Sequence, residues 1–308
     1  MSSTRVLVTG ANGFIGSSVK RAFENAGALV TGVDVRSAPG VVDVDLADRS
    51  QVQQLFDGGG YDVIAHLAAS AVGASGLLAS AHSDPIKAVD VNIAATVRLL
   101  EFAKETGASR FIYASSTTVY GPAGLYGPTN HRITEDAALL PASVYGATKA
   151  SAEQLGRCLT EGAETDFVAL RLPLVYGPKR WYGGALSPLL EILEAINDRN
   201  AVAVSVGTAI GDWLHVDDAA SAFVAVAQAV QPASAYHLVG HTGTMVDLAR
   251  QILELVPGNG VSLHCRYENE EQAPPLINDA RAREDLSFDP AYSDIYSAAD
   301  SLVVPHHK

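Results

Sequence analysis

Short apolar runs alternate with amphipathic stretches through the first 172 residues of the chain. The apolar runs are rich in β-branched residues and predict buried strands, at 5–9, 29–34, 62–67, 110–115 and 166–172. Between them, apolar residues recur every three or four positions and predict helices, at 16–26, 46–56, 86–106 and 144–159. Because strands that alternate with helices form right-handed crossovers, the pattern predicts an α/β fold with a doubly wound parallel sheet, covered by helices on both faces.

This alternation stops after Leu172, where proline and glycine residues crowd the chain. We therefore predict a larger domain over 1–172 and a smaller C-terminal α/β domain over 173–308, some of whose segments return to the first domain. Further helices are predicted over 246–256 and 279–286. The last eight residues, SLVVPHHK, are expected to be loosely ordered.

Composition narrows the classes of function. The formal net charge of −13 over 308 residues argues against nucleic acid and anionic membranes as partners. The chain lacks an apolar run of the roughly 18 residues that span a bilayer and a long apolar signal region, so we expect a cytoplasmic protein. Its two cysteines form no thiolate motif, and Cys158 is expected in the core. The histidines lack metal-ligand spacing, so no metal site is predicted.

Three glycines, Gly10, Gly13 and Gly16, stand three residues apart between the first predicted strand and the first predicted helix. In this context they would allow a tight turn, a close approach of the backbone to a pyrophosphate, and tight helix packing on the sheet. Asp34 ends the second predicted strand, where a carboxylate can accept hydrogen bonds from an adenosine ribose. That carboxylate would repel a 2′-phosphate, and although Arg36 lies two residues on, NAD is favoured over NADP. The pattern predicts a Rossmann-type dinucleotide site.

Tyr145 and Lys149 lie four residues apart in a predicted helix and therefore share one of its faces. A free tyrosine, with a pKa near 10, is a poor base at neutral pH. A nearby ammonium group, together with the positive ring of an oxidised nicotinamide, would lower that pKa. Tyr145 could then take the proton of a substrate hydroxyl.

A second polar cluster, Ser115 and Ser116, follows the strand predicted over 110–115, at the sheet edge where doubly wound folds place their ligands. We assign Ser116 to polarising the reacting oxygen and Ser115 to capping the strand.

Several ordered motifs together resemble one family. They are TGANGFIG at 9–16, HLAA at 66–69, SSTTVYG at 115–121, YGATK at 145–149, RLPLVYGP at 171–178, GDWLHVDDAASA at 211–222 and DARAREDLSFDP at 279–290. With them the chain resembles an extended short-chain dehydrogenase/reductase of the NAD-dependent epimerase/dehydratase group, which includes the nucleotide-sugar 4-epimerases. The resemblance spans nearly the whole chain.

That resemblance implies roles for individual residues. Tyr145 would be the general acid/base, Lys149 would hold the nicotinamide ribose, and Ser116 would polarise the substrate. The NAD site would comprise the three glycines and Asp34, with Tyr145, Lys149 and further residues that the resemblance assigns to it, Asn12, Phe14, Ile15, Asp45, Leu46, Leu67, Ala68, Ala69, Asn92 and Pro173. It also implies a homodimer that pairs the helices predicted over 86–106 and 144–159.

Four positions depart from the pattern of the group. Thr117 and Thr118 stand where sugar-nucleotide dehydratases carry an acid pair, which disfavours dehydration. Leu174 and Gly211 stand where nucleotide-sugar members often carry an asparagine and an arginine that contact the diphosphate of the substrate. Lys179 and Arg180 could compensate, but the departures favour a smaller polyhydroxylated substrate.

Long loops over 70–83 and 121–136 are predicted to cover the substrate mouth, with Thr117, Trp181 and Tyr182 as candidate substrate contacts. Three functions stay open. The first is an NAD-dependent dehydrogenase of a carbohydrate-like secondary alcohol. The second is a nucleotide-sugar 4-epimerase that retains its NAD. The third is an NAD-binding redox sensor or scaffold without catalysis.

Overall fold

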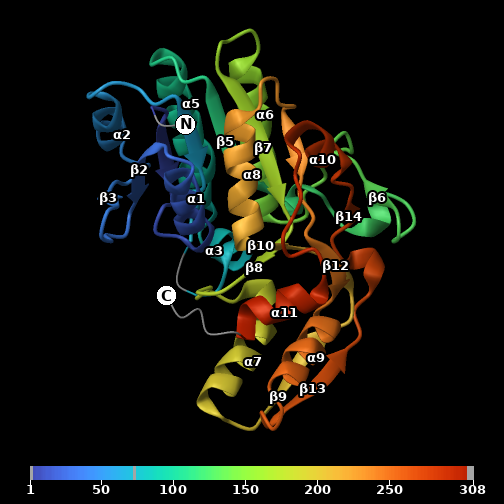
Figure 1. Ribbon diagram of the computed structural model, residues 1–308. Coiled ribbons are helices and arrows are strands. Elements are labelled where there is room, and N and C mark those ends of the chain that lie inside the picture. Colours follow the sequence, from blue (N-terminus) through green and yellow to red (C-terminus); the bar gives the residue numbers. More distant parts are fainter. Residues whose placement is uncertain (1–2, 72–73, 304–308) are drawn as a thin grey trace.

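The computed structural model describes residues 3–71 and 74–303. Its centre is a seven-stranded parallel sheet in the order β11-β7-β5-β4-β1-β2-β3 (Figure 1). The strands are β1 (Arg5–Thr9), β2 (Leu29–Asp34), β3 (Val42–Asp43), β4 (Val63–His66), β5 (Arg110–Ser116), β7 (Asp166–Leu172) and β11 (Ala235–His237). Between β1 and β4 the strand order reverses direction, and the crevice at the carboxyl ends there is where such sheets bind ligands. The predicted fold class is confirmed.

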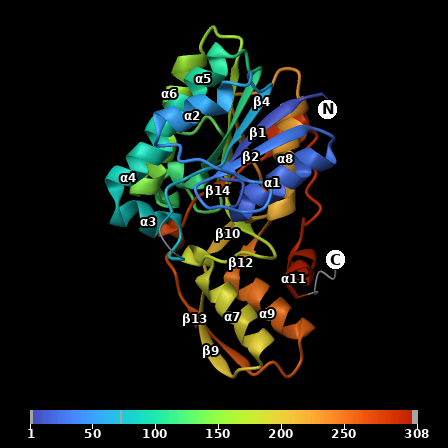
Figure 2. The same cartoon turned by 90° about the vertical axis from the view of Figure 1, so that its left-hand side faces the viewer.

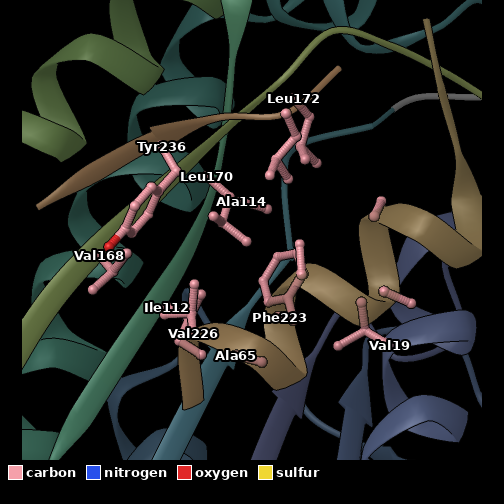
Figure 3. Packing of buried hydrophobic residues seen from close by; sticks show 14 of the residues in the cluster. Val19, Ala65, Ile112, Ala114, Val168, Leu170, Leu172, Phe223, Val226 and Tyr236 are labelled. Atoms are coloured by element: carbon pink, nitrogen blue, oxygen red, sulfur yellow. The ribbon is translucent and has the colours of Figure 1, made fainter. Parts of the chain in front are cut away.

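Helices cover both faces of this sheet, as the side view in Figure 2 shows. One face carries α1 (Phe14–Asn25) and α8 (Val216–Gln228), and the other carries α2 (Arg49–Phe56), α5 (Ala95–Glu105) and α6 (Val144–Thr160). Side chains alternate along β1, since Val6 and Val8 pack toward α1 and α8 whereas Leu7 packs toward α5. In Figure 3, Phe223 and Val226 of α8 lie against Ile112. Both faces are therefore apolar, as a buried parallel sheet requires.

A smaller lobe follows β7. Its three-stranded sheet has the order β12-β10-β8, and two pairs of strands, β9 with β13 and β6 with β14, lie beside it. The strands are β6 (Arg132–Ile133), β8 (Leu174–Tyr176), β9 (Val202–Gly207), β10 (Ile210–His215), β12 (His241–Thr244), β13 (Val261–Arg266) and β14 (Leu276–Ile277). Helices α7 (Ser187–Asp198), α9 (Met245–Leu255) and α11 (Ile295–Val303) pack around a separate core that includes Trp213. Short helix α10 (Ala280–Leu286) instead joins the core of the large sheet.

The chain crosses between the two lobes more than once. β11 pairs with β7 in the large sheet, and α8 packs on α1, although both come after β8, β9 and β10 of the smaller lobe in sequence. Among residues 3–71 and 74–303, no helix has the length and apolar character needed to cross a membrane, and no cluster of potential metal ligands is found in that same part.

Several predicted elements differ from the structure at their boundaries, and three of these differences are informative. The helix predicted from residue 46 begins at Arg49, because the Asp48 carboxylate caps it by accepting from the Ser50 and Gln51 amides at 2.8 and 3.3 Å. The helix predicted over 86–106 consists of α4 (Pro85–Val89), a π-helical turn over 90–94, and α5. The tail is helical as far as Val303, and its remaining residues lie outside the described part.

Two further expectations are corrected. Cys158 is exposed, because it lies on the outward stripe of α6 while Ala152 and Gly156 on the same helix face inward. Neither long segment is without secondary structure. The first contains α3 (Leu77–Ser83), and the second contains β6, which is anchored by its pairing with β14.

Candidate active site

The glycine turn closes against the end of β4. Gly10 has a φ of +68°, and a Cβ there would lie 2.9 Å from the Ala68 amide nitrogen. A Cβ on Gly16 would overlap the Gly10 carbonyl oxygen. Only glycine satisfies both constraints, because one position needs a left-handed backbone and the other allows no side-chain atom. The glycine turn, the segment after β4 and the start of α1 are therefore packed backbone against backbone at these two positions.

Asp34 holds the glycine turn against the end of β2. Its carboxylate accepts from the Asn12 amide at 3.1 Å and from the Arg36 amide at 3.0 Å. Arg36 also donates from Nη2 to the Asn12 carbonyl oxygen at 3.2 Å. Each carboxylate oxygen keeps one lone pair after these bonds. Asp34 can therefore accept from a ribose while it fixes the turn.

Other residues assigned to the NAD site lie around the same edge. Leu46 is buried, and its carbonyl oxygen accepts from Arg98 Nη1 at 2.7 Å. Asp45 is exposed, and its carboxylate accepts from the Ala47 amide at 2.9 Å. The remaining positions are at the N-terminus of α1, directly after β4, and between β7 and β8, namely Phe14, Ile15, Leu67, Ala68, Ala69 and Pro173.

Asn92 ties two elements of the site together from inside the π-helical turn. Its side-chain oxygen accepts from the Ser70 amide at 2.8 Å, and its Nδ2 donates to Thr148 Oγ1 at 3.0 Å. The residue is completely buried. Because both ends of its amide bond protein atoms, Asn92 acts in this structure as a positioning residue between the end of β4 and α6.

Tyr145 and Lys149 occupy the inner face of the first turns of α6, whose first turn Ser143 caps by accepting from the Gly146 amide at 3.0 Å. Lys149 is buried, and its Nζ donates to the Ala114 carbonyl oxygen at 2.7 Å. The same Nζ lies 4.4 Å from the ring centroid of Tyr113 and 5.6 Å from that of Tyr145. The predicted shared face is thus present in the structure.

Burial dominates the electrostatics of this pair. It lowers the pKa of Lys149 to about 7, although the Glu153 carboxylate pulls that pKa upward. Burial, with a smaller contribution from Tyr182, raises the pKa of Tyr145. The pKa of the phenol therefore moves opposite to the direction expected from the ammonium. An acidic phenol at this position needs a further positive charge beside it.

The polar turn after β5 is pressed against α6. A Cβ on Gly146 would overlap the Thr118 carbonyl oxygen, so the turn and the helix approach as closely as backbones allow. Ser116 is partly exposed, and its Oγ accepts from the Thr118 amide at 3.2 Å and from Thr118 Oγ1 at 3.0 Å. This contact brings the turn that contains Ser116 to the helical turn that begins at Tyr145.

A buried charged chain behind the site was missed by the sequence analysis. The Glu153 carboxylate accepts from Ser115 Oγ and pairs with Arg171, whose Nη2 lies 2.8 Å from Oε2. Arg171 also donates to the Tyr120 hydroxyl at 2.5 Å. The available signal was spacing, since Glu153 lies one turn beyond Lys149 on the same helix face. Ser115 is thus buried and committed to Glu153, whereas Ser116 is partly exposed and bonds only within its own turn.

The candidate substrate residues separate in the structure. Thr117 is buried. Trp181 is 46% exposed, and its ring lies over the guanidinium of Arg36 at 4.9 Å. Tyr182 packs edge-on against Phe14 with ring centroids 6.3 Å apart.

Comparison with known proteins decides the family. The model of the "NAD dependent epimerase/dehydratase family" matches residues 6–239. The chain belongs to this family. It is also 29% identical to a dTDP-glucose 4,6-dehydratase of Neisseria gonorrhoeae, over 92% of this chain and 90% of the relative.

Solved structures of other proteins superpose on the fold. UDP-glucose 4-epimerase of Thermus thermophilus, in complex with NAD, has a TM-score of 0.80 at 22% identity and is matched over 97% of this chain and 98% of its own. L-threonine dehydrogenase of Phytophthora infestans has a TM-score of 0.83 at 23% identity and is matched over 97% of this chain and 98% of its own. At such identities the likeness concerns the fold.

The described residues fit a dinucleotide. The epimerase/dehydratase family is NAD dependent, and in this member the backbone packing of the glycine turn excludes a Cβ at Gly10 and Gly16, while no side chain caps the N-terminus of α1. The amide groups there suit a pyrophosphate. An enzyme of this family with that loop intact retains the means to hold its cofactor.

Proposed function

We propose that the protein is an NAD-dependent dehydrogenase of a small carbohydrate-like secondary alcohol, such as a sugar or a sugar acid. The observation that carries this proposal is the contact between the Ser116 turn and α6, at the edge of the sheet where Tyr145 and Lys149 also lie. A protein that only senses or stores NAD would have no use for this group of side chains.

The residues would divide the work as follows. The glycine turn and Asp34 would hold NAD, and Lys149 would bind its nicotinamide ribose. NAD, when bound, supplies the acceptor for the hydrogen and the electron pair of the substrate C–H bond, and its oxidised ring adds the positive charge that Tyr145 needs. Tyr145 would take the hydroxyl proton at its Oη, while Ser116 Oγ would donate to the reacting oxygen. The secondary alcohol would thereby be oxidised to a ketone.

Residues beyond the catalytic centre support a substrate without a nucleotide diphosphate. A Cβ on Gly211 would meet only the Leu174 side chain, at 3.8 Å, so this region has open space and no cation at either position. Loss of an arginine that bonds phosphate typically costs about tenfold or more in affinity. Dehydration is disfavoured because Thr117 and Thr118 cannot protonate a leaving hydroxyl.

A 4-epimerase is the second candidate, since family membership supports it and the same catalytic groups would serve it. The two functions differ in cofactor handling. A dehydrogenase exchanges NADH at each turnover, whereas an epimerase returns the hydrogen to the same substrate and retains NAD.

The test starts with a thermal-shift screen of free sugars, sugar acids and sugar nucleotides in the presence of NAD. Stabilising compounds are then assayed for NADH formation. Steady NADH formation supports the dehydrogenase. Tightly retained NAD, with isomerised product and no net NADH, supports the epimerase and contradicts our proposal.

Tyr145→Phe isolates the chemistry. Because it removes only the hydroxyl that takes the proton, we expect turnover to fall by at least about a hundredfold, with the dissociation constant of NAD unchanged. Unchanged turnover would contradict the assigned mechanism. Tyr267→Phe, at a position on the small lobe where the side chain is 85% exposed, is the matched control.

We also propose a homodimer through α6 and the helical segment over 85–105. The outward stripe of α6 is formed by small or apolar residues, Ala147, Ser151, Leu155 and Cys158. Leu155 is 38% exposed and Val89 of α4 is 44% exposed. A partner helix would cover these side chains.

A further inference from the structure

A short segment after β8 contacts Phe14 and Arg36, which lie at or beside the proposed dinucleotide site. We call residues 180–183, Arg-Trp-Tyr-Gly, the aromatic strap. One end is fixed by the Gly183 amide, which donates to the Ala74 carbonyl oxygen at 3.0 Å. Lys179, just before the strap, has a φ of +67° and turns the chain into it. The strap thus reaches from the small lobe to the large sheet.

The aromatic strap contacts residues along the proposed dinucleotide site. Trp181 lies 4.9 Å from the guanidinium carbon of Arg36, two residues beyond the ribose-binding candidate Asp34. Tyr182 packs on Phe14, the first residue of α1, and stands close enough to Tyr145 to contribute to its raised pKa. The strap therefore passes the proposed adenosine and phosphate positions.

Arg180 carries a charge that no carboxylate balances. Its guanidinium donates to three backbone carbonyl oxygens, those of Val175 at 2.7 Å, Tyr182 at 3.0 Å and Gly183 at 3.3 Å. It also lies 5.5 Å from the Phe14 ring centroid. Within residues 3–71 and 74–303, no acidic side chain forms an ion pair with it.

A partly buried cation without an anion is costly. Burial lowers the pKa of Arg180, in keeping with that cost. An anion placed at the first turn of α1, beside Phe14, would offset the cost of burying this cation. Two diphosphates could do so, that of the cofactor or that of a nucleotide-sugar substrate.

We infer that the aromatic strap is the outer wall of the dinucleotide site, in which Arg180 faces the cofactor diphosphate and Trp181 covers the adenosine half. This inference rests on the proposed function, since it assumes NAD in the glycine turn. It assigns Trp181 and Arg180 to the cofactor, whereas their position in sequence suggested the substrate.

Binding of fragments tests each residue separately. Calorimetry with NAD and ADP, and displacement of NADH fluorescence by adenosine, give dissociation constants for wild type, Arg180→Gln and Trp181→Ala. Arg180→Gln should raise the dissociation constants of NAD and ADP by about tenfold and leave the dissociation constant of adenosine unchanged. Trp181→Ala should raise the dissociation constants of adenosine, ADP and NAD alike, by about threefold or more.

Matched controls exclude general effects. Arg250→Gln removes an exposed charge from α9, and Tyr267→Ala removes an aromatic ring that is 85% exposed on the small lobe. Neither should change any of the three constants. Arg180→Lys keeps the charge and should recover most of the lost ADP affinity, which separates the loss of charge from misfolding of the strap.

Two results would overturn the inference while NAD binding stands. One is Arg180→Gln with wild-type affinity for NAD and ADP. The other is Trp181→Ala with wild-type affinity for adenosine. A loss in Arg180→Gln confined to UDP, titrated in the presence of saturating NAD, is a case of the first result and would assign Arg180 to the substrate. Failure of the wild-type protein to bind NAD would instead contradict the proposed function.

Discussion

A single buried lysine shows how strongly this site depends on its surroundings. Lys149 is buried to 1% exposure, with one carbonyl acceptor and the face of Tyr113 as its near neighbours. Those neighbours do not replace the hydration of an ammonium, so its pKa falls to about 7. A lysine near half-protonation at neutral pH can accept or release a proton, whereas an ordinary lysine cannot.

This depressed pKa predicts a pH dependence of stability. Above pH 7 the folded protein has released the proton, while the unfolded chain keeps it up to the usual lysine pKa of 10.5. The unfolded state then binds more protons, so the contribution of Lys149 to the free energy of unfolding rises between pH 7 and 10.5, by up to about 1.4 kcal/mol per pH unit.

Lys149→Met removes the ionisable group and keeps most of the volume. Chemical denaturation at several pH values should therefore show wild type gaining stability relative to the variant from pH 7 upward. Lys87→Met, at an exposed position on α4, is the control, and its stability should depend on pH as that of wild type does. A wild-type advantage that shrinks over this range would contradict the burial argument.

At the scale of elements, the site depends on one close approach between the turn after β5 and the first turn of α6. Gly146 is its narrowest point, because a side chain there would overlap the Thr118 carbonyl oxygen. Periodicity and motif spacing in the sequence place Tyr145 on a helix, but they do not show which segment touches that helix. The function of Gly146 follows from the tertiary contact alone.

Gly146→Ala should push the turn away from the helix. Overpacking of this kind costs about 1–3 kcal/mol of stability, which outweighs the better helix propensity of alanine. We expect a lower melting temperature and a fall in turnover through displacement of Ser116, with NAD binding retained. Gly58→Ala, where a Cβ would meet nothing within 4 Å, should change neither property. Wild-type turnover in Gly146→Ala would show that Ser116 does not need this contact.

Local features of the site were predictable from sequence, and long-range ones were not. The glycine turn was readable because its constraints lie within a few residues, and the alternating pattern was enough for the parallel sheet. The Glu153–Arg171 pair joins α6 to β7, so neither residue alone indicated the other. The π-helical turn that contains Asn92 keeps helical periodicity on both sides, which hid the extra residue.

At the scale of the whole molecule, the chain fixes the two lobes against each other by returning to the large sheet. After β10 it enters α8, which packs on α1, and then β11, which extends the sheet beside β7. The Asp218 carboxylate of α8 accepts from the Ala291 and Tyr292 amides at 2.8 and 3.1 Å, which ties the C-terminal segment to the same helix. The proposed dinucleotide site therefore lies on two lobes that are joined at several points. The apolar stripe of α6 lies on the outside.

That outward stripe predicts the assembly state. If α6 pairs with a second copy, a charge at Leu155 would be buried against apolar side chains, at a cost of several kcal/mol that the interface cannot offset. Light scattering after gel filtration should then give the mass of a dimer for wild type and of a monomer for Leu155→Lys. Val230→Lys, at a position 91% exposed after α8, should remain dimeric and controls for a general effect of added charge. A wild-type protein that elutes with the mass of one chain would contradict the proposed dimer and leave the catalytic proposal untouched, because every residue assigned to that site comes from a single chain.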